Sequence, residues 1–168
     1  MKRINVVPYK SSWEKDFQNE NKKIQNVLPI KVEIYHIGST SIPNMFAVPI
    51  VDLMIVVQSL KEFDRYSKVL CTIGYEPMGE TCEEERRIFM KCEGDCSYHI
   101  HIFQQGNPEI ERRIAFREFM IAHTDQALEY SRLKKELANQ FSNDEANYKK
   151  GRSEFLEKVD QQASKWKT

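Results

Sequence analysis

The sequence predicts an α/β fold of the α+β type, in which a small mixed β-sheet is flanked by helices and followed by a helical C-terminal part. Three observations predict it. Short apolar or alternating segments at 31–37, 49–57 and 86–103 have the length and period of strands, whereas the segments around them repeat at the helical period. Beyond residue 107 only helical patterns remain. Because no linker or repeat interrupts the chain, we expect one domain over residues 1–168.

The first helix and the first two strands are predicted by local signals. A capping-box pattern, Ser11-Ser12-Trp13-Glu14, opens a helix that Pro29 ends. Residues 31–37 alternate and predict a strand, and 49–57 are apolar on both faces, as in a strand with neighbours on either side. A further helix is expected from residue 59 to about residue 71.

Residues 86–103 predict a β-hairpin whose register depends on its turn. The turn could consist of Gly94-Asp95 alone or of three residues that begin one position earlier. The three-residue turn separates polar from apolar residues more cleanly between the two faces, and we therefore expect it. In that register Arg87 lies beside His101, on the same face. The same register makes neighbours of Cys92 and Cys96 on the apolar face.

Three helices are predicted in the C-terminal part. Asn107-Pro108-Glu109 combines a cap, a proline in the first turn and an acid at the positive end of the helix dipole, which indicates a helix to about His123. Thr124 begins the next helix, to about Gln140, and Asn143 precedes the last. We expect the basic side chains of these helices, Lys134 and Arg117 among them, to lie on solvated surfaces rather than to close a basic rim around a site.

Composition limits the classes of function. The formal net charge is zero, with 25 basic and 25 acidic residues, whereas broad nucleic-acid binding usually requires a basic excess. No apolar stretch approaches the roughly 20 residues of a membrane span, and the N-terminus is too short and polar for a signal peptide. The cysteines, Cys71, Cys82, Cys92 and Cys96, lack the paired spacing of a zinc knuckle. We expect a cytoplasmic protein with reduced thiols.

The segment 36–57 contains the main candidates for a binding or catalytic site. The turn Gly38-Ser39-Thr40-Ser41 follows a strand, and glycine and hydroxyl groups there suit a phosphate-binding turn, since backbone N–H groups must approach the anion. Asp52 lies inside an apolar run, where a carboxylate is costly unless it is paired or binds a cation. We therefore predict a metal–phosphate site, with an ion pair between Asp52 and Arg87 as the structural alternative.

Histidines and one arginine are the further candidates. His99 and His101 lie two residues apart on a strand, so both rings face the same way and could bind the metal or transfer protons. His36, just before the turn, could complete the cluster. Histidine ligands favour zinc, manganese or iron over magnesium. The alternative is a hydrogen-bonded sheet face without metal. Of the pair Arg86-Arg87, the hairpin register favours Arg87 for a phosphate oxygen, because guanidinium offers a planar fork.

The chain resembles the GrpB family of bacterial proteins. The likeness rests on His36-Ile-Gly-Ser-Thr-Ser-Ile-Pro, Pro49-Ile-Val-Asp52, His99-Ile-His101, Phe116-Arg-Glu-Phe119 and Leu133-Lys134. That family is similar to the nucleotidyltransferase superfamily, whose Gly-Ser turn precedes an acid–apolar–acid strand. Here Asp52 matches the first acid, but Met54 stands in place of the second. Arg152, after Tyr148, replaces a lysine that relatives carry, and Val48 replaces another.

The resemblance implies a nucleotidyltransferase-like fold and metal-dependent nucleotidyl or phosphoryl transfer to a small-molecule or protein hydroxyl. The donor would be a nucleotide or another phosphorylated small molecule, and Mg²⁺ or Mn²⁺, or alternatively Zn²⁺, would be the cofactor. Because Met54 removes an acid, a non-catalytic nucleotide-binding or regulatory module is the alternative, and a His/Asp metal-dependent hydrolase is the third. The implied residues are Asp52, His101 and Arg87 for catalysis, Gly38, Ser39, Thr40, Ser41 and Arg87 for phosphate, and Asp52, His99, His101 and His36 for metal.

Overall fold

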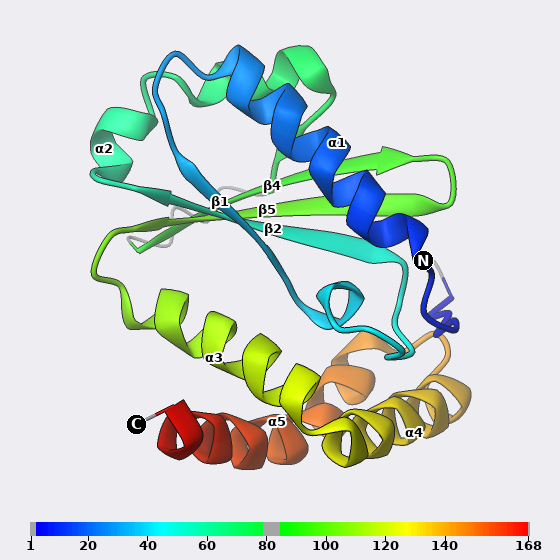
Figure 1. Cartoon of the computed structure of the whole chain (residues 1–168). Helices are drawn as coiled ribbons and strands as arrows, with labels where there is room; N and C mark the ends of the chain where they lie inside the picture. The colour runs from blue at the N-terminus through cyan, green and yellow to red at the C-terminus, as the bar shows by residue number, and fades with distance from the viewer. Residues whose placement is uncertain (1–2, 79–84, 168) are drawn as a thin grey trace.

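The computed structural model describes residues 3–78 and 85–167 (Figure 1). The strands are β1 (Glu33–Ile37), β2 (Ile50–Val57), β3 (Glu76–Pro77), β4 (Arg86–Glu93) and β5 (Cys96–Gln104). The α-helices are α1 (Ser12–Val27), α2 (Leu60–Phe63), α3 (Pro108–Ala122), α4 (Thr124–Gln140) and α5 (Glu145–Lys167), and the 3₁₀-helices are η1 (Ser39–Ser41) and η2 (Ser67–Ile73). The strands form a mixed sheet in the order β1-β2-β5-β4-β3. The predicted fold class is confirmed.

Helix α1 covers one face of the sheet (Figure 1). Its apolar side chains Trp13, Phe17 and Ile24 pack against alternate residues of β2 and β5, including Leu53 and Ile100, which are fully buried. Since β2 is paired on both sides, antiparallel to β1 and parallel to β5, its backbone groups are satisfied within the sheet. This side of the molecule is the main hydrophobic core.

A buried ion pair joins α1 to β4 inside this core. The Lys91 ammonium lies 2.7 Å from a carboxylate oxygen of Glu20, and the side chains are 7% and 2% exposed. The Tyr75 hydroxyl donates to the same oxygen of Glu20 at 2.7 Å. Burial alone raises the pKa of Glu20, but the hydrogen bonds from Lys91, Tyr75 and Lys23 outweigh it, so the pKa lies below its ordinary value. The carboxylate is therefore charged at neutral pH.

Helices α3, α4 and α5 gather on the other side of the sheet (Figure 1). Helix α3 packs Ile110 and Ile114 against Ile37, Met54 and Phe103 of the sheet. The three helices also pack against each other and against the segment after η1. The predicted C-terminal helices are confirmed with nearly the expected bounds. Among the residues that the structure describes, no helix is both long and apolar enough to cross a bilayer.

Two local predictions are wrong in detail. The helix expected over 59–71 divides into α2 and η2, and Gly74 ends η2 in the left-handed region at φ 96°. Helix α1 begins where the capping box predicts, but Ser11 is itself helical in conformation and its side chain caps nothing. A capping box requires an extended residue at that position, so this one does not form.

The predicted hairpin register is also wrong. Glu93 pairs with Cys96 and Met90 with His99, which makes Gly94-Asp95 a two-residue turn. Gly94 has φ 63° and supplies the positive φ that such turns need at their first central residue. Cys92 pairs with Ser97 instead of Cys96, so the two cysteines point to opposite faces. Cys82 lies outside the described residues.

Candidate functional site

The turn after β1 packs directly against Asp52. Ile37 pairs with Asp52 across β1 and β2, and Gly38 follows with φ 77°. A Cβ atom at Gly38 would lie 2.5 Å from Asp52 Oδ2, closer than real contacts allow. Glycine is therefore required there by both backbone conformation and space. The predicted turn and the predicted carboxylate are adjacent.

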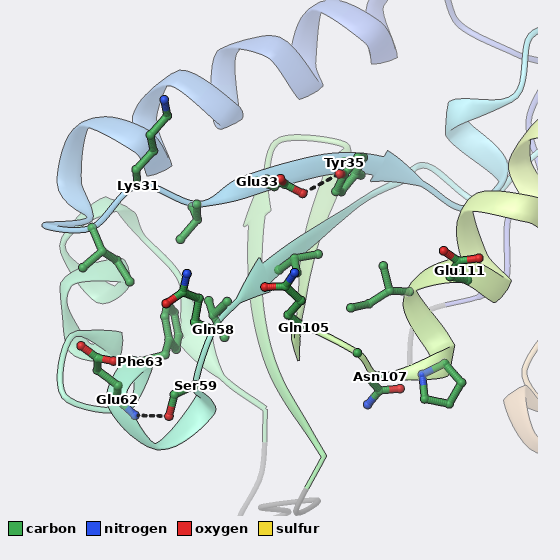
Figure 2. A pocket seen from close by; sticks show the side chains of 17 residues that line it. Lys31, Glu33, Tyr35, Gln58, Ser59, Glu62, Phe63, Gln105, Asn107 and Glu111 are labelled. Carbon is green, nitrogen blue, oxygen red and sulfur yellow. Dashed lines mark hydrogen bonds between the residues drawn. The ribbon is translucent and has the colours of Figure 1, made fainter.

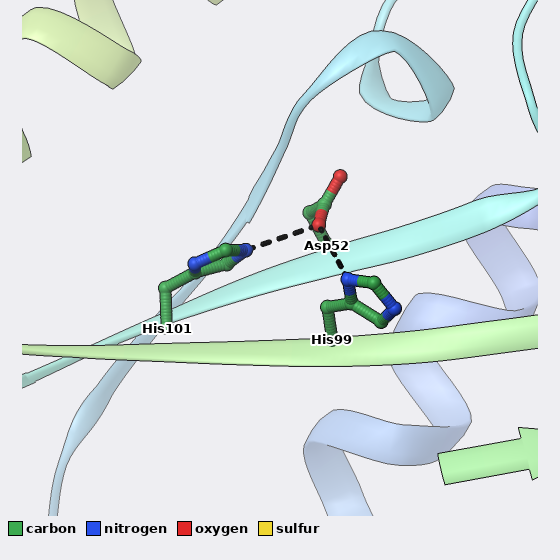
Figure 3. A group of neighbouring side chains, drawn as sticks. All are labelled: Asp52, His99 and His101. Carbon is green, nitrogen blue, oxygen red and sulfur yellow. Dashed lines mark hydrogen bonds and ion pairs between the residues drawn. The ribbon is translucent and has the colours of Figure 1, made fainter. Parts of the chain in front are cut away.

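Asp52, His99 and His101 form a cluster on the α3 side of the sheet (Figure 3). Asp52 Oδ1 lies 3.1 Å from His101 Nε2 and 4.0 Å from His99 Nδ1. The parallel pairing of β2 with β5 sets Asp52 beside His99, and the period of β5 brings His101 to the same face. All three side chains are partly exposed, between 13% and 24%. The cluster is thus accessible from solvent.

The donor set of this cluster fits a divalent metal ion. One potential ligand atom from each residue lies within 4.8 Å of the others. Burial lowers the pKa of His99, and the nearby Asp52 carboxylate opposes this only in part, so the imidazole is neutral at pH 7 and can donate a lone pair. Two imidazoles with one carboxylate suit Mn²⁺ or Zn²⁺ better than Mg²⁺.

Lys134 joins the site from α4, contrary to the expectation of a solvated side chain. It is only 1% exposed, and its ammonium donates to Ser39 Oγ at 2.9 Å and lies 4.4 Å from the centre of the Tyr130 ring. Burial lowers its pKa well below the ordinary value, and the like charge of Arg152 lowers it further. No carboxylate of the described residues forms an ion pair with Lys134, so a bound anion would stabilise the protonated form of this buried amine.

Arg152 of α5 lies behind Lys134. It donates to the Tyr130 hydroxyl at 3.2 Å, and its guanidinium carbon lies 4.7 Å from the centre of the Tyr148 ring. Its Nε has no hydrogen-bond partner among the described residues. Two basic side chains from different helices therefore lie around Tyr130, and one of them reaches Ser39. Sequence spacing alone could not reveal this, because Ser39 and Lys134 are 95 residues apart.

The other hydroxyl groups of the turn are used structurally. Thr40 is 2% exposed and donates to the carbonyl oxygen of Ile50, and Ser41 donates to the carbonyl oxygen of Gly38. Arg117, expected on the helix surface, donates from α3 to the carbonyl oxygen of His36 at 2.8 Å. Ser39 is the member of the turn whose hydroxyl faces the cationic side chains.

His36 does not join the Asp52 cluster. It pairs with Leu53, one position away from the pair formed by Ile37 and Asp52, so its ring lies on the α1 face. The ring stacks on Phe17 at 4.8 Å, and its Nε2 lies 3.1 Å from Thr40 Oγ1. Burial lowers its pKa. The expectation that His36 completes the metal site is therefore wrong, and its contacts make it a support for the turn.

Arg87 lies on the face opposite His101, because the two-residue turn shifts the register by one position. Its guanidinium donates to both carboxylate oxygens of Asp64, at 2.9 and 3.0 Å. The expected proximity to His101, and with it an ion pair with Asp52, is wrong. Arg86 instead shares the histidine face, since Ile88 pairs with His101 and Arg86 lies two residues away on β4.

Comparison with known proteins shows the family to which this chain belongs. Residues 3–162 match the model of the family described as GrpB protein. "UPF0157 protein YqkA" of Bacillus subtilis is 36% identical over 99% of this chain. The match covers about half (49%) of that relative's length. A crystal structure of the GrpB protein from Enterococcus faecalis superposes with a TM-score of 0.89 at 32% identity, over 98% of this chain and 100% of that one.

A more distant likeness is to the Cid1 poly(U) polymerase solved with magnesium and 3′-dATP. The TM-score is 0.49 at 11% identity, over 87% of this chain and 49% of Cid1. At that level the likeness carries no functional argument.

Proposed function

This chain is a member of the GrpB family, and we propose that it is a cytoplasmic, metal-dependent transferase that moves a nucleotidyl or phosphoryl group from a nucleotide to a hydroxyl acceptor. Asp52, His99 and His101 hold the divalent cation in this proposal. Ser39 and Lys134, with Arg152 behind them, bind the phosphates of the donor.

The buried amine of Lys134 is the observation that carries the proposal. Burial without a carboxylate disfavours the protonated form of this amine, and a phosphate oxygen next to Ser39 would stabilise that form. Because Gly38 packs on Asp52, a phosphate at Ser39 would lie close to the metal ligands. Adjacent anion and cation sites are what phosphoryl transfer requires, since this chemistry needs positioning and charge neutralisation more than covalent help.

In the proposed transfer, the phosphate-binding residues and the metal ligands have separate roles. Lys134 and Ser39 donate hydrogen bonds to non-bridging phosphate oxygens and so orient the donor. A bound divalent cation would neutralise charge that develops on the transferred group. Asp52 Oδ1 and His101 Nε2 lie 3.1 Å apart, and a cation held by these two residues would also make a bound acceptor hydroxyl a better nucleophile. Arg87 has no part in this scheme, because it binds Asp64 on the other face.

Met54 favours a second function, nucleotide binding without catalysis. It occupies the position of the second acid, is fully buried, and packs with Ile37 and Phe103 beneath α3. An apolar residue so well packed leaves the site with a single carboxylate on β2. In that case the same residues would bind nucleotide and metal but transfer nothing.

A thermal-shift experiment tests both functions. The protein is melted with ATP, GTP, CTP or UTP, each with Mg²⁺, Mn²⁺ or Zn²⁺, and the Asp52→Asn and Lys134→Met variants are treated identically. A ligand at a hundred times its Kd adds about 2.7 kcal/mol, which for a chain of this length raises Tm by roughly 8 °C. We expect a shift that needs nucleotide and metal together and that both variants lose.

The outcomes separate the alternatives. Mass spectrometry of hydroxyl acceptors mixed with the stabilising nucleotide detects transfer, and its absence despite binding supports the non-catalytic function. Stabilisation by metal alone, unchanged in Lys134→Met, supports a metal-dependent hydrolase instead. If no combination shifts Tm, or if Asp52→Asn responds like the wild type, the proposed site is wrong.

A further inference from the structure

A cavity of about 800 Å³ lies at the other end of the sheet from Asp52 (Figure 2). It opens where the parallel strands β2 and β5 end, at the last pair Val57 and Gln104. Asp52 lies five residues earlier on β2, which at the rise of a strand is about 17 Å away. The cavity is therefore separate from the proposed transfer site.

The topology of the chain creates this cavity. After β2 the chain turns to α2, on the side of the sheet that α1 covers, and after β5 it turns to α3, on the opposite side (Figure 1). Where two neighbouring parallel strands continue to opposite faces, their carboxyl ends leave a crevice, and ligands of open α/β sheets bind in such crevices. A volume of this size is within the range of small-molecule sites.

The walls combine an apolar surface with free amides. Val56 and Val57 of β2, Phe63 of α2 and Ile110 of α3 contribute apolar atoms. Gln58 and Gln105 follow the two strand ends and extend into the space between α2 and α3 (Figure 2). Neither side-chain amide hydrogen-bonds another described residue. Such amides are available to orient a ligand over the apolar wall.

The charged residues around the cavity determine whether it favours a cationic or an anionic ligand. Glu33, Glu62 and Glu111 line it, against one cation, Lys31. Glu33 accepts a hydrogen bond from the Tyr35 hydroxyl at 2.7 Å, and neither Glu62 nor Glu111 forms an ion pair with another described residue. The carboxylates repel phosphate and attract ammonium or guanidinium groups. A nucleotide therefore fits the Lys134 site and not this one.

We propose that this cavity is a second binding site that accepts a small organic cation, a protonated amine or guanidinium on an apolar or aromatic body. The body lies on the wall formed by Val56, Val57 and Ile110, and the amides of Gln58 and Gln105 bind its polar atoms. The carboxylates on three sides of the cavity attract the cationic group (Figure 2). The site binds independently of metal and nucleotide.

Amide chemical shifts of the ¹⁵N-labelled full chain test this site with tyramine and agmatine, without metal or nucleotide. We expect at least one cation to shift amides within 30–35, 56–59 and 105–111 in a saturable manner. 4-Hydroxyphenylacetate, an anion of nearly the same shape as tyramine, should not. The triple variant Glu33→Gln, Glu62→Gln, Glu111→Gln should weaken binding about tenfold, because each exposed ion pair contributes a few-fold at most. Glu157→Gln, an exposed position on α5, serves as the control.

Three results would overturn the proposal. One is that neither cation shifts these amides, and another is that the anion binds as tightly as tyramine. The third is that the triple variant, with an unchanged spectrum in the absence of ligand, binds the cation as the wild type does. Since no nucleotide or metal is present, failure here leaves the transfer site unaffected, and the reverse holds as well.

Discussion

Replacing Lys134 with methionine tests the central electrostatic argument. The side chain is 1% exposed, and its ammonium is held by the Ser39 hydroxyl at 2.9 Å and the Tyr130 ring at 4.4 Å. Methionine fills nearly the same volume but has neither charge nor donor. A hydrogen bond to a charged group contributes about 1.5–3 kcal/mol, which corresponds to roughly 10- to 150-fold in affinity. We expect Lys134→Met to weaken pyrophosphate binding by that factor in isothermal titration calorimetry.

The same variant should alter how stability depends on pH. Burial lowers the pKa of Lys134 in the folded protein, whereas the unfolded chain keeps the ordinary value of 10.5. Between these two values the unfolded state binds more protons than the folded state, so the free energy of unfolding rises with pH. One extra proton bound by the unfolded state raises the free energy of unfolding by at most about 1.4 kcal/mol per pH unit. Lys134→Met removes this contribution and should be the more stable protein at neutral pH.

Urea denaturation at pH 7, 8, 9 and 10 measures the difference between wild type and variant. The difference in the free energy of unfolding should shrink as pH rises, because the wild type gains stability with pH and the variant does not. Lys135→Met, at an exposed neighbouring position of α4, loses only a contact with the Phe46 ring and should keep the pH dependence of the wild type. A constant difference between wild type and Lys134→Met would refute the inference that burial lowers the pKa of this amine.

Further predictions concern the cluster and the core. Asp52→Asn should abolish stabilisation by Mn²⁺ together with nucleotide while leaving Tm without ligands within a few degrees; an unchanged response to this pair in a thermal melt would remove Asp52 from the ligand set. Gly38→Ala should cost about 1–3 kcal/mol, because alanine must adopt φ 77° and its Cβ meets Asp52; urea denaturation checks this, and a neutral effect would contradict the packing. Glu20→Gln removes the buried partner of Lys91 and leaves it only the exposed carboxylate of Glu93 at 3.4 Å, so we expect a loss of about 3–5 kcal/mol, or roughly 8–14 °C in Tm, against no measurable change for Glu157→Gln. Because the pKa of Glu20 is lowered in the folded state, its contribution is present above the ordinary value of 4.5 and disappears as pH falls through the folded value; acid denaturation of Glu20→Gln should lack this step.

The hairpin shows why sequence reasoning chose the wrong face for Arg87. That reasoning assumed one polar and one apolar face, but helices cover both sides of this sheet, so polarity does not decide the register. Lys91 looks like a solvent-facing residue and is in fact buried against Glu20. The glycine at position 94, with its positive φ, was the better signal, because it satisfies a two-residue turn.

The alternation of side chains along β1 explains why His36 does not join the Asp52 cluster. Adjacent residues of a strand point to opposite faces, so once Ile37 pairs with Asp52 the ring of His36 must lie on the other side. The sequence indicates both strands but not how they are aligned. The positions of His99 and His101 follow from their spacing alone, and for that reason their shared face was predictable. Lys134 could not be found in this way, because its burial depends on how α4 packs across the turn.

The charge of the metal ligands around Asp52 affects how tightly a cation and a phosphate would bind together. With Met54 in place of an acid, the cluster holds one carboxylate and two imidazoles, and burial keeps His99 neutral. These ligands supply a single negative charge, so a divalent cation is only half neutralised by the protein. Arg152 adds positive charge nearby, and a bound phosphate would balance it and favour the protonated form of Lys134. Cation and phosphate are thus expected to bind more tightly together than either does alone, because each supplies the charge that the other requires.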